Sequence, residues 1–144
     1  AWMDPGPLGT LGVGMPFALA AQIAHPKKRV VIMYGDGSFG LNGFEYDTAV
    51  RFGLPIIGVM GNDAAWGQMM RPQGAVYGWD RLAATELTYT RYDKVVEALG
   101  GHGEYCERPE EIRPALDRAA ASGKPALVNI KIRQDKEYKG GIYV

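Results

Sequence analysis

The chain has 144 residues, 47% of them hydrophobic and 22% charged, and its 16 basic and 16 acidic side chains give a formal net charge of zero. This length and composition are ordinary for one compact α/β domain with a core of its own. Nucleic acid and membrane are not expected as partners, because no basic patch alternates with aromatic residues, and the longest apolar stretch, residues 13–24, is too short to span a bilayer and is interrupted by glycine and proline.

The first predicted element, residues 6–21, is rich in glycine, alanine and other small or apolar residues. Its glycines do not match the Gly-x-Gly-x-x-Gly fingerprint of dinucleotide-binding loops, and no strand precedes them. Leu11 and Met15 have two interpretations at this point: packing on a helix rich in glycine and alanine, or direct contact with a bound cofactor.

Two acidic turns follow the next two predicted strands. Residues 29–34 form an apolar strand that leads into a Gly-Asp-Gly turn around Asp36, and residues 55–61 form a second strand that leads into an Asn-Asp turn ending at Asp63. The carboxyl ends of parallel strands form the ligand-binding edge of an open α/β sheet, so we expect the two carboxylates to meet there. Two carboxylates, phosphate oxygens and water make the kind of oxygen shell that Mg²⁺ prefers.

Small residues flank Asp36 on both sides. Gly35 and Gly37 permit a close approach of the backbone to a phosphate, and Ser38 offers a hydroxyl and an amide donor. A helix that begins near residues 41–43 is expected to point its positive end toward the bound anion. Each acidic turn taken by itself is also a common loop motif without any ligand.

The rest of the chain continues the alternation of helices and strands. The expected elements are helices over residues 47–52, 91–99 and 109–121, strands over residues 103–107 and 125–132, a helix that begins at residue 66, a loop over residues 71–79, and a polar tail over residues 134–144.

Cysteine and histidine provide no catalytic or metal-binding pattern. The single cysteine, Cys106, excludes an internal disulfide, indicates a reducing compartment and is expected to be a buried strand residue. Because no stretch is expected to span a membrane, a cytoplasmic location is expected by default. His25 and His102 are predicted in loops, and neither has a metal-ligand spacing with another residue.

The Gly-Asp-Gly turn, the 24 intervening residues and the Asn-Asp turn together resemble the thiamine diphosphate-binding motif, which runs from Gly-Asp-Gly to Asn-Asn across a comparable gap. The resemblance implies that Mg²⁺ is bound by Asp36, by Asp63 in the place of the second asparagine, and by the main-chain carbonyl of Ala65. Asp63 departs from the motif, because a carboxylate in place of a carboxamide keeps an oxygen ligand but adds a negative charge beside the diphosphate.

Residues 6–21 are similar to a segment that lines the thiamine in relatives of acetolactate synthase and oxalyl-CoA decarboxylase. The similarity implies that the carbonyl of Gly9 accepts a hydrogen bond from the amino group of the aminopyrimidine ring. It also implies that Leu11 supports the bent form of the cofactor. Together with Gly35, Gly37 and Ser38, these residues form the implied cofactor-binding set.

Both stretches together resemble the C-terminal, diphosphate-binding domain of the 2-hydroxyacyl-CoA lyase, oxalyl-CoA decarboxylase and acetolactate synthase family. The resemblance implies a doubly wound α/β fold, with a mainly parallel sheet flanked by helices, and a single domain over residues 1–144. In that family it is the last of three domains. We therefore expect the pyrimidine-binding domain, with its activating glutamate, to lie outside these residues, and we expect the isolated chain to be inactive and to self-associate.

Residues 61–68 look most like the 2-hydroxyacyl-CoA lyase and oxalyl-CoA decarboxylase branch of this family. This resemblance implies an enzyme that cleaves a carbon–carbon bond next to a carbonyl. The implied substrate is a small molecule, with an acyl-CoA as the candidate. Acetolactate synthase is the alternative among thiamine diphosphate-dependent enzymes. The enzyme is also expected to be a homo-oligomer. Two alternatives lie outside this class of enzyme: a catalytically silent domain, and a Mg²⁺-dependent phosphotransfer or receiver-type domain. The chain has no Gly-x-x-x-x-Gly-Lys-Ser/Thr phosphate loop, which argues against the last of these.

Overall fold

The computed structural model describes residues 1–135, so the predicted tail lies outside the described residues from residue 136 onward. With η for a short 3-10 helix, the elements in chain order are η1 (Gly6–Leu8), α1 (Gly14–Ala24), β1 (Val31–Gly35), α2 (Asp36–Asn42), α3 (Glu45–Arg51), β2 (Ile57–Asn62), α4 (Gly67–Tyr77), η2 (Trp79–Arg81), α5 (Tyr92–Ala98), β3 (His102–Cys106), α6 (Pro109–Ala121) and β4 (Ala126–Lys131). Across residues 1–135, every helix is too short or too polar to reach from one side of a lipid bilayer to the other.

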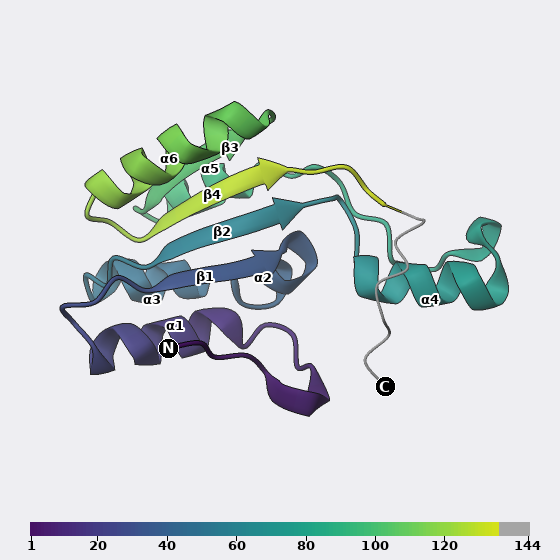
Figure 1. Cartoon of the computed structure of the whole chain (residues 1–144), viewed down its shortest axis with the longest axis horizontal. Coiled ribbons are helices and arrows are strands. Elements are labelled where there is room, and N and C mark those ends of the chain that lie inside the picture. Colours follow the sequence, from purple (N-terminus) through teal and green to yellow (C-terminus); the bar gives the residue numbers. More distant parts are fainter. Residues whose placement is uncertain (136–144) are drawn as a thin grey trace.

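The four strands form one parallel sheet in the order β1-β2-β4-β3. Val31 of β1 lies opposite Ile57 of β2, and Gly35 lies opposite Gly61, so the carboxyl ends of these two strands meet at the same edge. The chain passes from β2 out to β3 and then returns through α6 to place β4 between them. Because parallel crossovers are right-handed, this reversal puts α6 on the face opposite the earlier helices. The predicted doubly wound α/β fold is confirmed (Figure 1).

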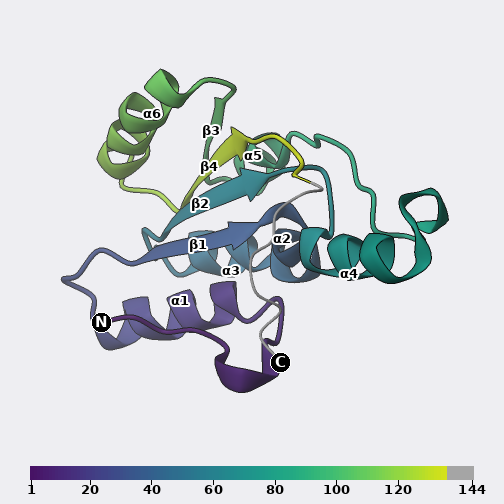
Figure 2. The same ribbon diagram turned by 45° about the vertical axis from the view of Figure 1, so that its right-hand side comes forward.

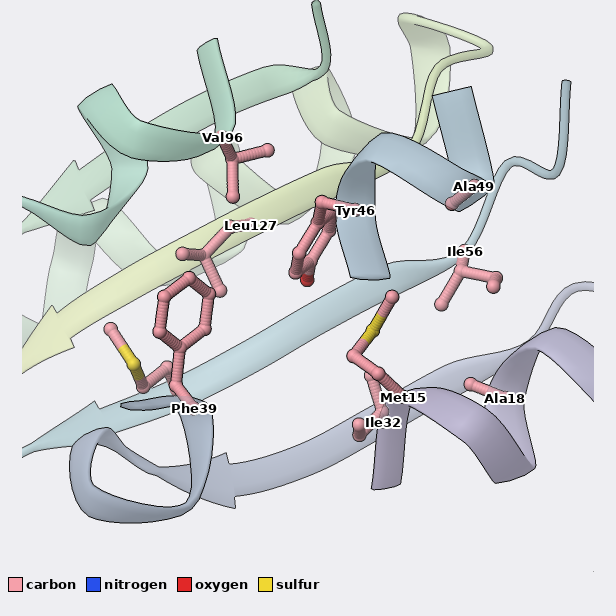
Figure 3. Close-up of a cluster of buried hydrophobic side chains, with 10 residues drawn as sticks. Met15, Ala18, Ile32, Phe39, Tyr46, Ala49, Ile56, Val96 and Leu127 are labelled. Atoms are coloured by element: carbon pink, nitrogen blue, oxygen red, sulfur yellow. The ribbon is translucent and has the colours of Figure 1, made fainter. Parts of the chain in front are cut away.

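Each face of the sheet has its own hydrophobic core. On one face, side chains from α1, α2, α3 and α5 pack against strand residues that include Ile32 and Leu127. On the other face, α6 packs against residues that include Ile57 and Val128. Figure 3 shows the first core, where side chains from several helices and strands point toward one another. The second core does not cover β1, whose Met33 is 70% exposed.

A hydrogen-bonded pair of tyrosines lies within the first core. Tyr46 is fully buried (Figure 3), and its hydroxyl donates to the carbonyl of Ala126 at 3.2 Å. The hydroxyls of Tyr34 and Tyr46 share a second hydrogen bond of 2.9 Å. Gly58 leaves the space for this pair, because a Cβ there would overlap the Tyr46 hydroxyl. The phenol pair therefore links α3 to β1 and to the start of β4.

Tyr46→Phe is expected to lower the free energy of unfolding by about 1–2 kcal/mol, because it removes both hydrogen bonds of a buried hydroxyl without changing the ring. Urea unfolding is the measurement. Tyr34→Phe is the matched control: it keeps the hydrogen bond between Tyr46 and Ala126, so its loss should be smaller. Equal losses in the two variants would contradict the assignment of the larger role to Tyr46.

The helix after the Gly-Asp-Gly turn begins earlier than predicted. The sequence predicts a start near residues 41–43, whereas α2 begins at Asp36 itself. The reason is Phe39, which is only 5% exposed and whose ring centroid lies 4.8 Å from that of Tyr92. Burying this ring against the core requires the glycine-rich segment to coil at once, although glycine disfavours helix on local grounds.

The predicted loop over residues 71–79 is also wrong, because α4 continues through Pro72 to Tyr77. Met70 anchors this helix and is fully buried. Gly74 gives room to the ring of Trp79, since a Cβ there would lie 2.5 Å from that ring. His102, predicted in a loop, is the first residue of β3, and Cys106 is a buried strand residue as predicted.

Candidate functional site

A cavity of about 1380 Å³ opens at the carboxyl edge of β1 and β2 and extends along β1 to the N-terminal segment and α1. Figure 2 shows α2 following directly from β1 at this edge, with α4 beside it. The predicted site residues that line the cavity are Leu11, Gly35, Asp36, Gly37, Ser38, Asp63 and Ala65. Gly9 is exposed and is not among the lining residues, so the role of its carbonyl stays a prediction.

Asp36 is a buried carboxylate that no other described residue hydrogen-bonds. Asp36 is 1% exposed, and neither Oδ1 nor Oδ2 has a hydrogen-bond partner among residues 1–135. Burial, and then the nearby charge of Asp63, raises the pKa of Asp36 to about 6. The main-chain N–H groups of Gly37, Asp36 and Ala65 oppose this rise, but none reaches hydrogen-bond geometry. An unpaired buried carboxylate is costly, and such groups in proteins are paired or bind metals.

The residues around Asp36 fit a divalent cation. Asp63 is half-buried, follows β2 directly and is close enough to raise the pKa of Asp36. Ala65 is 3% exposed and lines the same cavity. Within residues 1–135 no three His, Cys, Asp or Glu side chains gather into a metal site, so the main-chain carbonyl of Ala65 stays the predicted third protein ligand. Two carboxylates and a carbonyl are the hard oxygen donors that suit Mg²⁺.

Asp63 has a positive charge in its neighbourhood. A Cβ on Gly67, the first residue of α4, would lie 3.2 Å from Oδ2 of Asp63 and 3.4 Å from the guanidinium of Arg71. Glycine at this position therefore lets the carboxylate and the guanidinium flank the start of α4. This nearby cation offsets part of the charge that Asp63 adds to the site.

Gly37 and Trp66 pack against each other at the wall of the cavity. A Cβ on Gly37 would lie 2.9 Å from Cε3 and 3.0 Å from Cδ2 of Trp66, closer than side chains approach one another. Gly37 therefore lets α2 contact the indole ring directly, next to Asp36 and Ala65. The sequence indicates close approach to a phosphate as the role of Gly37, and it gives no sign of this ring.

Ser38 holds the N-terminal segment in place. Its Oγ accepts a hydrogen bond from the N–H of Gly12 at 3.3 Å, and the side-chain amide of Asn42 donates to the carbonyl of Gly12 at 2.8 Å. Leu11, which is 37% exposed, is thereby fixed at the cavity wall. Sequence reasoning missed Asn42, which lies four residues after Ser38 and therefore on the same side of α2.

The turn that contains Asp63 has an unusual backbone. Ala64 adopts the left-handed conformation, with φ at 57°, which costs about 1–2 kcal/mol for a residue other than glycine. The side-chain oxygen of Asn62 accepts from the N–H of Ala64 at 3.2 Å, and the N–H of Leu87 donates to the Ala64 carbonyl at 2.7 Å. Sequence reasoning gave Asn62 no role of its own, although it is half of the Asn-Asp pair.

Comparisons with known proteins identify the family of this chain. The family model described as "Thiamine pyrophosphate enzyme, C-terminal TPP binding domain" matches residues 1–130. The chain is 50% identical to a probable acetolactate synthase of Mycobacterium bovis over 90% of its length. It is 44% identical to 2-hydroxyacyl-CoA lyase 2 of Caenorhabditis elegans over 99% of its length. It spans only 23% of the length of each of these two relatives.

The fold also matches a solved structure. That structure is a thiamine diphosphate-dependent 4-hydroxybenzoylformate decarboxylase of Rhodococcus jostii, with a TM-score of 0.81 and 23% identity. The match covers 90% of this chain and 24% of the decarboxylase chain, and it supports the fold alone. On the evidence of the family model and the relatives, the chain belongs to the family of C-terminal thiamine pyrophosphate-binding domains of thiamine pyrophosphate enzymes.

Proposed function

We propose that this domain anchors the diphosphate of thiamine diphosphate through Mg²⁺, as the C-terminal part of a larger enzyme that cleaves or forms a carbon–carbon bond next to a carbonyl. The observation that carries the proposal is Asp36, a buried carboxylate at the wall of a large cavity that has no hydrogen-bond partner within residues 1–135 and has Asp63 beside it. A cation bound between these oxygens would pair the buried charge and attract the diphosphate.

Each residue of the site has a distinct part in this proposal. Asp36, Asp63 and the carbonyl of Ala65 would hold the cation, and Gly35 and Gly37 keep side chains away from the diphosphate. The apolar side chain of Leu11 would orient the organic part of the cofactor and exclude water. When bound, thiamine diphosphate supplies the carbon nucleophile and accepts the electron pair of the broken bond.

The substrate class that we propose is a 2-hydroxyacyl-CoA, cleaved into a carbonyl compound and formyl-CoA. Support comes from 2-hydroxyacyl-CoA lyase 2 of several animals, whose similarity extends over 98–99% of this chain. A carboligase that forms acetolactate is the second candidate, favoured by the 50% identity to a probable acetolactate synthase. We place the activating glutamate on a pyrimidine-binding domain and the enzyme in the cytoplasm.

The two candidates are separated by an assay of the complete enzyme with thiamine diphosphate and Mg²⁺. A lyase will release aldehyde and formyl-CoA from a 2-hydroxyacyl-CoA and will form little acetolactate from pyruvate. Acetolactate as the main product would reject the lyase and favour the carboligase. Activity on neither compound would reject both candidate reactions, while a cofactor titration would still test the anchoring role.

A partner surface is proposed on the exposed side of β1. Val31 and Met33, which are 54% and 70% exposed, present apolar side chains there, and both residues line the cavity. Exposed apolar surface of this kind marks contacts with other domains or subunits. We propose that the pyrimidine-binding domain, in a homo-oligomer, completes the site on this side.

Asp63→Asn is expected to raise the half-saturating Mg²⁺ concentration for cofactor binding about tenfold, which corresponds to about 1.4 kcal/mol. The variant keeps an oxygen ligand and removes one negative charge, so the KM for substrate should change little. Asp47→Asn is the control, because it removes a charge from an exposed pair with Arg51 on α3. An unchanged Mg²⁺ titration in the Asp63 variant would count against its role as a ligand.

A further inference from the structure

Three buried polar side chains form a connected group beneath the turn of residues 63–65. Asn62 ends β2, Asn129 lies within β4 and Asp93 lies in the first turn of α5. Each of them is at most 1% exposed. Buried polar groups destabilise a protein unless they are hydrogen-bonded, and these three find their partners in one another and in the main chain of Thr90.

The hydrogen bonds of this group run in one direction. Asn62 donates from Nδ2 to Oδ1 of Asn129 at 3.2 Å, and Asn129 donates from its own Nδ2 to Oδ1 of Asp93 at 3.1 Å. A carboxylate only accepts hydrogen bonds, so Asp93 decides which end of the Asn129 amide faces it. The Asn129 oxygen is thereby turned toward Asn62, and the Asn62 oxygen toward the N–H of Ala64.

Asp93 is itself held as a carboxylate. Arg91 donates from Nη2 to Oδ2 of Asp93 at 2.6 Å and from Nε to Oδ1 at 2.9 Å. Burial would raise the pKa of Asp93, but the hydrogen bonds from Arg91 and Asn129 outweigh this effect, and the net pKa is lowered. Asp93 is therefore ionised at neutral pH and can only accept hydrogen bonds.

At the other end of these hydrogen bonds, Asn62 is bonded to Ala64, which has a strained backbone. Ala64 has a φ of 57°, a conformation that alanine rarely adopts. It lies between Asp63 and Ala65, the two residues of this turn with proposed oxygen ligands. Loss of the bond from its N–H to Asn62 would let this backbone relax and would shift the two residues that carry the proposed ligand oxygens.

We infer that Asn129 and Asp93 are positioning residues that act through Asn62 to hold the turn of residues 63–65 in the geometry required for binding Mg²⁺ and the diphosphate. The inference rests on the proposed function of this site. Mutation of residues that hydrogen-bond to metal ligands and orient them typically lowers metal affinity by 10-fold to 100-fold.

The test is Asn129→Leu in the complete enzyme, because leucine is similar in size and removes the hydrogen bonds to Asn62 and Asp93. Asp93→Asn is a second, nearly isosteric variant that removes the acceptor-only end of the group. The measurement is calorimetric titration with thiamine diphosphate at several Mg²⁺ concentrations, together with the Tm of the metal-free protein. Tyr46→Phe serves as the control for loss of stability, since Tyr46 lies in the core and not among the cavity-lining residues.

Both variants are expected to raise the half-saturating Mg²⁺ concentration about tenfold, whereas Tyr46→Phe lowers Tm without this change. Asp93→Glu, which keeps the carboxylate, is expected to recover part of the loss. If Asn129→Leu and Asp93→Asn lower Tm but keep the wild-type Mg²⁺ titration, the positioning role is overturned and the proposed function stands. If the wild-type enzyme binds the cofactor equally well without Mg²⁺, the proposed function fails and this inference fails with it.

Discussion

Replacing Asp36 with asparagine will abolish the Mg²⁺-dependent binding of thiamine diphosphate and will stabilise the metal-free protein at pH 8. The first effect follows from the loss of a carboxylate that, on our account, binds the cation directly. The second follows from the same burial, because the unpaired charge of Asp36 destabilises the folded state whenever no cation is bound. Function and stability therefore oppose each other at this residue.

The pH dependence of the Asp36→Asn effect has a defined sign. Burial and the charge of Asp63 raise the pKa of Asp36 in the folded protein from 3.8 to about 6. Folding therefore disfavours the ionised form, so the stability cost is absent below about pH 4, grows between about pH 4 and pH 6, and is complete above that range. The gain from asparagine should be roughly 1–3 kcal/mol at pH 8 and should disappear near pH 4.

Thermal unfolding of metal-free wild type and variant at pH 8 and at about pH 4 measures this difference. Added Mg²⁺ should raise the Tm of the wild type and leave the variant unchanged, since only the wild type binds it tightly. Asp47→Asn, an exposed carboxylate paired with Arg51, is the control and should show neither effect. A variant that loses stability at pH 8 would show that Asp36 is not an unpaired charge in the folded protein.

Gly37→Ala is expected to weaken thiamine diphosphate binding by tenfold or more, which is at least about 1.4 kcal/mol. The added Cβ would lie 2.9 Å from the Trp66 ring, so the ring has to move. Trp66 directly follows Ala65, and its N–H is bonded to the carbonyl of Thr85 at 2.8 Å. Displacing the ring therefore disturbs the backbone that carries a proposed cation ligand.

Gly40→Ala is the matched control for this substitution. Gly40 belongs to the same helix α2, and nothing lies within 4 Å of a Cβ added there. Alanine stabilises a helix relative to glycine by about 1 kcal/mol, so the control should bind cofactor normally and should be slightly more stable. Equal affinities of the two variants in a calorimetric titration would show that the contact between Gly37 and Trp66 has no part in the site.

The sequence predicts the strands and the position of the acidic pair, because both depend on local patterns. The apolar runs before Asp36 and Asp63 place these residues at one edge of a parallel sheet, and the structure confirms that edge. The start of α2 and the length of α4 could not be predicted in this way. Burial of Phe39 and Met70 decides them, and glycine and proline in the local sequence favour the opposite assignment.

The group formed by Asn62, Asn129 and Asp93 illustrates what the sequence leaves out. The three residues are far apart along the chain and meet only because β4 is inserted beside β2 and α5 packs against β4. One local signal existed, since an asparagine inside the buried strand Ala126–Lys131 needs a partner. The sequence shows that need, but only the topology identifies Asn62 and Asp93 as the partners.

The most direct test of the anchoring role is a calorimetric titration of the complete, metal-free enzyme with thiamine diphosphate, with and without Mg²⁺. Our account predicts binding at one site per chain when Mg²⁺ is present and little or none when it is absent. Asp36→Asn should give no binding in either condition. Equally tight binding without Mg²⁺, or Mg²⁺-dependent binding that persists in Asp36→Asn, would contradict the proposal that these carboxylates hold the diphosphate through a cation.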